Sequence, residues 1–186
     1  MRTQPTQGSL FERQKMMLAA NIRWLRQAQH LLEQISDSAY SDSPERLAPH
    51  RVGGHMRHIL EFYECFLEGL DRRHIDYDAR RRDPALETSR RVALGRIADL
   101  IRALETEPAL RGDAVVWVRM EDADQDMGEP FLTSSIGREL QTLSSHTIHH
   151  FALIAITLRV LGYSVARDFG MAPSTLRYMS ARVEAA

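Results

Sequence analysis

Apolar residues recur every three or four positions in four long stretches of this chain, and this period constrains its fold more than any other feature. The stretches cover residues 9–35, 50–71, 83–105 and, from 134 or 135, to 161. Each one carries a single apolar stripe, which a helix buries against its neighbours. A chain of 186 residues can form one domain with a sizeable core. We therefore predict an all-α fold, a four-helix bundle, as a single domain over residues 1–186.

The connections between these helices are marked by turn residues and by one β-like stretch. Prolines predict a loop over 36–49, and a polar connection follows the second helix at 74–82. Residues 114–120 are rich in β-branched and aromatic side chains, so we expect a short β-hairpin between the third and fourth helices, with 130–133 as the partner strand.

Three local signals complete the predicted outline. Asp83 and Pro84 suit the start of the third helix, and Gly162 suits the end of the fourth. The acidic segment 121–129 inside the hairpin is expected to be a mobile loop, and long connections of this kind often serve a function. A short turn or helix is expected near 174–179.

Composition excludes several classes of protein. The formal net charge of −1 argues against a general nucleic-acid binder, which is normally basic. The longest apolar stretch, 151–158, is far shorter than the ~20 residues that span a bilayer. With a polar start, 1–8, and one cysteine, Cys65, nothing requires secretion or an oxidising compartment. We expect a cytoplasmic protein without a nucleic-acid or membrane partner.

Three of the eight histidines, His146, His149 and His150, are close together on the predicted fourth helix. Residues four apart lie on one face of a helix, so His146 and His150 point the same way and can chelate one metal ion. His149 is rotated away from that line. Two buried, hydrogen-bonded histidines without a metal would be an equally good reading of this pair alone.

The second predicted helix adds His55 and His58, which also face inward. Gly54 lies one turn before His58 and is expected to leave space beside its ring. His58 lies ~8 residues into its helix and His146 ~11 into its own, which gives depths of ~12 Å and ~17 Å. In an up-down-up-down bundle the second and fourth helices run parallel, so the two histidines would lie at similar heights and converge.

The sequence Val52-Gly53-Gly54-His55-Met56-Arg57-His58-Ile59-Leu60, together with His146-Thr147-Ile148-His149-His150, resembles the DinB-like superfamily. This superfamily includes YfiT-type proteins and bacillithiol- and mycothiol-dependent transferases, and the resemblance extends over nearly the whole four-helix pattern. It implies a zinc or nickel ion held by His58, His146 and His150, with His55 as the competitor for the first position. Many members follow the last histidine with Arg-Gly-Gln, whereas Phe151-Ala152-Leu153 stands here, which puts substrate handling in doubt.

The resemblance also implies an activity: thiol-dependent transfer or isomerisation at a divalent metal, with a low-molecular-weight thiol and a small-molecule substrate, in a homodimer. Two alternatives stay open. One is metal-dependent hydrolysis with Glu139 or Glu61 as the base; either could also be a second-shell partner, and a surface or capping role is the more favoured reading for both. The other is a non-catalytic, metal-binding stress-response module. Cys65 is expected to be a small buried hydrophobe rather than a ligand.

Two loops differ in their expected distance from the metal. Residues 76–80 follow the second helix ~18 residues beyond His58, or ~27 Å along a straight helix, so we expect them to stay away from the metal. Residues 37–49 precede the same helix at its metal end, and we expect any lid to come from there.

Overall fold

The computed structural model describes residues 7–47, 50–120 and 131–184. Most of these residues are helical, which confirms the predicted predominance of α-structure, and a small three-stranded sheet accompanies the helices. The predicted loop 121–129, Pro130 and the side chain of Phe11 lie outside the described part. The helices are α1 Gln7–Gln34, α2 Asp37–Ser41, α3 Val52–Gly69, α4 Pro84–Thr88, α5 Arg90–Thr106, α6 Ile136–Val160 and α7 Pro173–Glu184.

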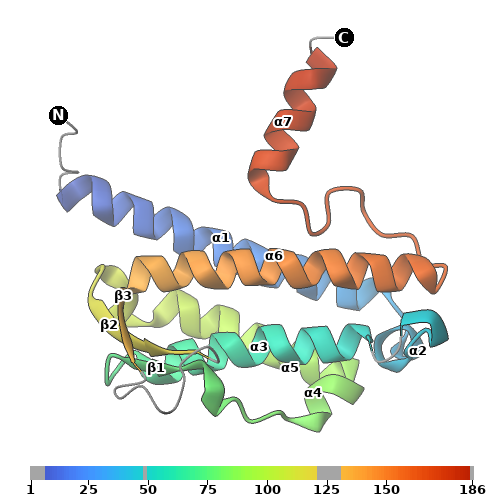
Figure 1. Cartoon of the computed structure of the whole chain (residues 1–186), viewed down its shortest axis with the longest axis horizontal. Helices are drawn as coiled ribbons and strands as arrows, with labels where there is room; N and C mark the ends of the chain where they lie inside the picture. Colours follow the sequence, from blue (N-terminus) through green and yellow to red (C-terminus); the bar gives the residue numbers. More distant parts are fainter. Residues whose placement is uncertain (1–6, 48–49, 121–130, 185–186) are drawn as a thin grey trace.

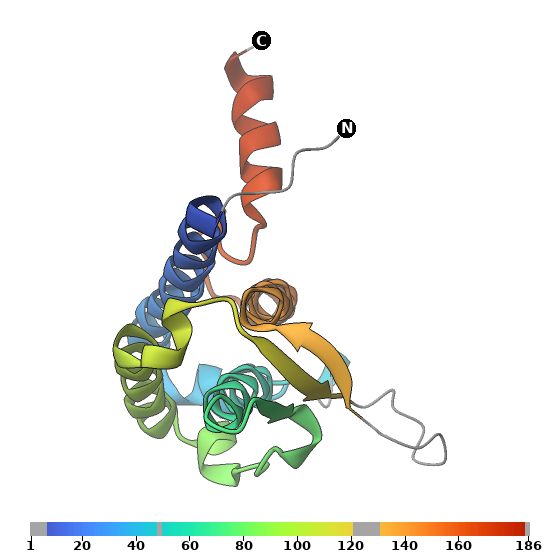
Figure 2. The same ribbon diagram turned by 90° about the vertical axis from the view of Figure 1, so that its left-hand side faces the viewer.

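The four long helices predicted from the sequence correspond to α1, α3, α5 and α6. These helices pack around one apolar core. α6 packs on both α1 and α3, and α5 packs on the same two helices from the other side. Figure 2, which looks along the helices, shows these four around the core and α7 apart from them. Most of the apolar residues in the predicted stripes are buried, while Leu18, Ile22, Ile101 and Leu161 are partly exposed. No helix in the described part of the chain is long and apolar enough to cross a membrane.

The sheet covers one end of these helices, beside the C-terminal end of α3 (Figure 1). Its order is β1-β2-β3, with β1 His74–Asp76, β2 Val115–Arg119 and β3 Leu132–Ser135. The antiparallel pairing of β2 with β3 matches the predicted hairpin, and Val116 lies opposite Ser134. β1 was not predicted: it pairs in parallel with β2, so the segment after α3 is more than a polar connection.

α3 and α6 run antiparallel, which corrects the prediction that these two helices are parallel. α3 ends at the sheet, and α6 begins there (Figure 1). His55 contacts His150 while His58 contacts His146, so residue numbers rise along one helix as they fall along the other. The histidines still meet, because His58 lies eleven residues before Gly69 and His146 lies ten residues after Ile136.

The chain after α3 folds back along that helix, which makes the antiparallel arrangement possible. Gly69 allows the reversal, because a Cβ there would lie 2.5 Å from the carbonyl oxygen of His74. Tyr77, in a 3-10 turn after β1, stacks on Phe62 of α3 with 4.9 Å between ring centroids. The backbone N–H of Asp83 then donates to Glu61 of α3 at 2.7 Å. Residues 74–83 therefore lie along α3 rather than beyond its end.

Several predicted boundaries need correction. The loop expected over 36–49 contains α2, capped by Ser36, and a 3-10 turn over Glu45–Leu47. Tyr40 of α2 is fully buried and donates to the carbonyl of Leu86, so this part of the expected lid is fixed in the core. The third predicted helix is broken at Ser89, whose side chain caps α5. The C-terminal helix α7 is longer than expected.

Candidate metal centre

Three histidine side chains converge between α3 and α6. Nε2 of His146 lies 3.0 Å from Nε2 of His58 and 3.1 Å from Nε2 of His150. One ring nitrogen from each residue lies within 4.8 Å of the others, and all three side chains are half-buried. The structure thus brings together the three residues that the sequence predicted as metal ligands.

The chemistry and spacing of these nitrogens fit a divalent transition metal. Imidazole is a favoured ligand of zinc, nickel and copper. Tetrahedral zinc with Zn–N distances of ~2.0–2.1 Å places its nitrogens ~3.3 Å apart, close to the separations found here. In the described part of the chain no cysteine or carboxylate joins these three histidines in a group of metal-ligand size. Three nitrogens leave at least one coordination position for a ligand.

His55, the competitor for the first ligand position, lies beside this group rather than within it. Its Nδ1 is 3.1 Å from Nδ1 of His150, so the two rings share a hydrogen bond on the side away from the Nε2 cluster. Its other face stacks on His50 with ring centroids 5.4 Å apart. A histidine that receives the Nδ1–H of His150 leaves Nε2 of His150 to bind metal. His55 is therefore placed to orient the ring of His150.

The sequence analysis also made predictions for two residues beside the cluster, His149 and Gly54, and only the one for His149 holds. His149 is exposed on α6, as its rotation away from His146 predicts. Its ring packs beside that of His150, with 5.2 Å between the ring centroids. Gly54 does not make room for His58: a Cβ there would first meet Arg51 at 3.4 Å and Glu87 at 4.0 Å. The tight position is Gly53, where a Cβ would lie 1.9 Å from the carbonyl oxygen of Glu87. Gly53 thus lets α4 approach α3.

Burial keeps two of these imidazoles neutral. Burial, followed by the neighbouring His146, His58 and His55, lowers the pKa of His150 to about 2. Burial, with His50 and His149, lowers the pKa of His55 to about 4. A metal competes with protons for histidine nitrogens, so a ring that stays neutral has its lone pair available.

Arg80 reaches the cluster, which corrects the expectation that residues 76–80 stay away from it. Its Nη1 lies 3.3 Å from Nδ1 of His58, and its guanidinium lies 4.8 Å from the ring centroid of Phe62. The expectation assumed that the chain continues beyond α3, whereas it folds back along the helix. Ile75 of β1 and Tyr77 of the following turn are both buried, but two apolar residues are too few to reveal a strand from the sequence.

The two candidate bases are buried and hydrogen-bonded away from the three ligand nitrogens. Glu139, in the first turn of α6, accepts from the hydroxyls of Tyr77 at 2.9 Å and Ser134 at 2.6 Å. Glu61 accepts from the backbone N–H of Asp83, as described above. Both therefore attach the segment after α3 or the sheet to the long helices. Neither is the surface residue that the alternative reading allowed.

Cys65 has the structural position that was expected, and Trp24 also belongs to the core. Cys65 is a free, buried thiol, and burial raises its pKa to about 11, so it is a poor source of thiolate. Trp24 packs in the core and donates from its indole N–H to Ser144 at 2.7 Å. Trp117 differs, because its side chain on β2 is partly exposed and stacks beside His74.

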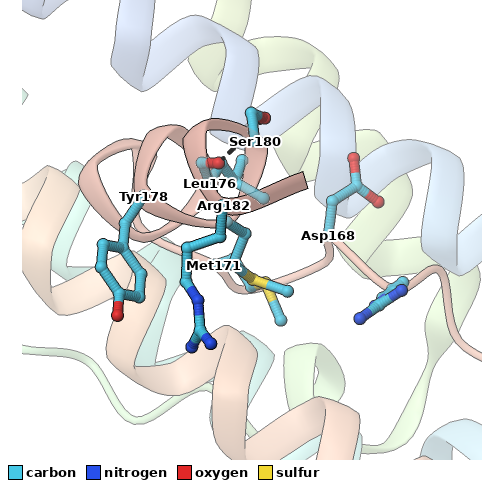
Figure 3. Close-up of a pocket in the computed structure, with 8 residues that line it drawn as sticks. Asp168, Met171, Leu176, Tyr178, Ser180 and Arg182 are labelled. Atoms are coloured by element: carbon cyan, nitrogen blue, oxygen red, sulfur yellow. Dashed lines mark hydrogen bonds between the residues drawn. The ribbon is translucent and has the colours of Figure 1, made fainter. Parts of the chain in front are cut away.

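A cavity of about 630 Å³ lies away from the histidines, between α7 and the segment that leads to it (Figure 3). Met171, Leu176 and Arg182 are among its lining residues. α7 stands on the side of α6 away from α3 in both ribbon views, whereas the histidines lie between α6 and α3. The cavity shares no residue with the cluster.

Comparison with known proteins gives one partial match. The chain is 34% identical over 105 residues to a curated protein from Rhizopus delemar named FK506-binding protein 5. The match covers 56% of this chain and 27% of that protein, so the chain spans about a quarter of the length of the relative that it matches. No protein-family model matches the chain. No solved structure matches it either.

Proposed function

We propose that this protein binds one divalent transition metal, zinc or nickel, through His58, His146 and His150. The observation that carries the proposal is the convergence of three Nε2 atoms from α3 and α6, two of the separations being 3.0 and 3.1 Å. Protein sites that hold zinc with three side chains and keep a position open are catalytic rather than structural. The site is therefore proposed to be an active site.

The activity proposed is thiol-dependent transfer or isomerisation, in a bundle of the DinB-like type. The histidine pattern that resembles this superfamily falls on the three residues that converge. Low-molecular-weight thiols have a pKa near 8.5, so little thiolate exists at neutral pH. A bound dication supplies the positive charge that favours the thiolate. The protein's own Cys65 is buried and is not a substitute for an external thiol.

The chain's own residues contribute binding and orientation. His55 holds the ring of His150 through the Nδ1 contact, and Phe62 packs against His146 with 4.1 Å between ring centroids. These contacts fix the ring planes, so the ligand lone pairs stay directed at one point.

Hydrolysis and simple metal binding are the two alternative outcomes. Hydrolysis would need a general base that can reach the ligand's position, and both oxygens of Glu139 and one of Glu61 already accept hydrogen bonds. A non-catalytic module would bind metal and turn over nothing. A panel of thiol-dependent and ester substrates separates these alternatives from the proposed reaction.

The test uses protein loaded with cobalt, whose visible spectrum reports its ligands. Glutathione, bacillithiol, mycothiol and 2-mercaptoethanol are titrated in turn. We expect a sulfur-to-cobalt charge-transfer band with at least one thiol, and no such band in the His146→Ala protein. If no thiol changes the spectrum at millimolar concentration, the thiol-dependent proposal is wrong, whereas the metal site itself is judged by cobalt stoichiometry.

We further propose a cytoplasmic homodimer. The cytoplasm supplies reduced thiols, and the one cysteine needs no oxidising compartment. Ile156 and Val160 of α6 are each 49% exposed, which gives that helix an apolar outer surface on which a second copy can pack.

A further inference from the structure

Three buried polar side chains, one from each of α1, α3 and α6, form a hydrogen-bonded cluster in the core. Asn21 of α1 and Tyr63 of α3 are fully buried, and Thr147 of α6 is 1% exposed. The Tyr63 hydroxyl donates to Oδ1 of Asn21 at 2.7 Å. Because that hydroxyl has only one hydrogen, the Thr147 hydroxyl is the donor in its 3.3 Å contact with the Tyr63 oxygen.

The amide of Asn21 links this cluster to the backbone of two helices. Its Nδ2 donates to the carbonyl oxygens of Met17 in α1 and of Leu140 in α6, each at 2.9 Å. The amide therefore bonds to α1, α3 and α6 at once. Burying polar groups costs free energy unless their hydrogen bonds are made, and these bonds are directional. The cluster is satisfied only when the three helices have one particular position along their lengths.

The apolar contacts around the cluster are less selective for that position. Apolar burial is non-directional, and a slide of α6 by one turn, about 5.4 Å, keeps the same stripe facing the core. Such a slide would carry Nε2 of His146 away from Nε2 of His58, which lies 3.0 Å from it, and out of reach of a shared ion. It would also separate the hydroxyls of Tyr63 and Thr147. The hydroxyl contact and the histidine contact therefore require the same register.

We propose that Tyr63 and Thr147, held by Asn21, are positioning residues that fix the register of α3 against α6 and so hold the histidines of the metal site together. Thr147 directly follows His146, and Tyr63 lies five residues after His58, so the cluster and the ligands share both helices. A buried polar residue that specifies the register of packed helices has this role in coiled coils. The inference rests on the metal site proposed above and makes its affinity depend on side chains that are not ligands.

The experiment compares the full-length wild-type protein with Tyr63→Phe and Tyr40→Phe. Tyr40 is the matched control, because it is also a fully buried tyrosine, and its hydroxyl donates to the carbonyl of Leu86, which joins α2 to α4 instead of α3 to α6. Each variant removes one buried hydroxyl and keeps the ring. Cobalt affinity is measured by competition with a chelator, and the visible spectrum reports the cobalt geometry. The midpoint of thermal unfolding is measured without metal.

Both tyrosine variants are expected to unfold at a lower temperature than the wild type, since each loses a buried hydrogen bond. Only Tyr63→Phe should also weaken cobalt binding, by about fivefold, the factor that corresponds to one neutral hydrogen bond. Its cobalt absorption bands should shift, because the three nitrogens no longer keep one geometry. Unchanged cobalt affinity and spectrum in Tyr63→Phe, or an equal loss of affinity in Tyr40→Phe, overturns the proposal. A wild-type protein that binds no cobalt instead refutes the metal site.

A second pair of variants tests the same contact from α6 and keeps the proposal testable if Tyr63→Phe does not fold. Thr147→Val removes the hydroxyl at nearly constant volume, and we expect cobalt affinity to fall by about fivefold. Thr147→Ser keeps the hydroxyl and should bind cobalt as the wild type does. If Thr147→Ser loses as much affinity as Thr147→Val, the hydroxyl does not position the ligands and the proposal is wrong.

Discussion

The two faces of α6 present different kinds of chemistry on one helix. The face toward α3 carries His146 and His150, whose ring nitrogens meet those of His58. The solvent-exposed side, farther along the helix, carries Ile156 and Val160, which are large, apolar and half-exposed. The inner face places polar groups in the packed seam between α3 and α6, where burying them costs free energy. The outer face exposes apolar groups to water, which is also unfavourable.

The cavity beside α7 and the histidine cluster also lie in different places. Among the described residues, those that line the cavity beside α7 all come from one stretch of chain, residues 167–182. The histidine cluster is formed by two helices in a fixed antiparallel register. Its pair His58 and His146 is separated by 88 residues of sequence. Residues that are held so exactly in register are better candidates for function than residues that line an open cavity.

The largest expected effect is the loss of metal when an inner-face ligand is removed. His150→Ala leaves two imidazoles, which rarely hold a labile ion, so stoichiometric metal should be absent. His149→Ala is the matched control, one residue away and exposed, and it should keep the metal. Metal content by mass spectrometry, on protein purified without a histidine tag, measures both. Full occupancy in His150→Ala would show that the seam is not the metal site.

A smaller effect is expected from His55, which supports a ligand without being one. His55→Ala removes the partner of Nδ1 of His150, and loss of such a support costs ~10-fold or more in metal affinity. The measurement is a competition titration against a chelator of known affinity. Complete loss of metal would instead make His55 a ligand, and unchanged affinity would make the contact incidental.

The smallest effect on the metal is expected from the outer face. Ile156→Asp places a charge where the second copy is proposed to pack, so the dimer should dissociate while metal content stays unchanged. Light scattering of the wild type and the variant, at micromolar concentration, gives the two masses. Two monomer masses would remove the dimer from the proposal, and loss of metal with loss of the dimer would tie the two faces together.

Sequence reasoning found histidines that converge because helical spacing is local. His146 and His150 are four apart, and that alone places them on one face. It could not choose between His55 and His58, which are three apart and both face inward. That choice depends on the register of α3 against α6, which places His58 against His146 and His55 against His150.

The direction of α3 and the position of Arg80 could not be predicted because both depend on one non-local event. Residues 74–76 pair with β2, some forty residues later, and this pairing turns the chain back along α3. A three-residue strand has almost no signature of its own. The convergence of the histidines was nevertheless predicted correctly from a parallel arrangement that is wrong, since both sets lie near the middle of their helices.

The position of the site in the seam between α3 and α6 also determines the stage of folding at which the site can form. A metal held there would act as a clip that closes a loop of 88 residues, from His58 to His146. Neither end of the clip has useful affinity alone, because one helix offers a single nitrogen and the other offers two. Tight metal binding would therefore occur only after α3 and α6 have packed together. By the same linkage, removing the metal would lower the free energy of unfolding of the whole core and not only of the site.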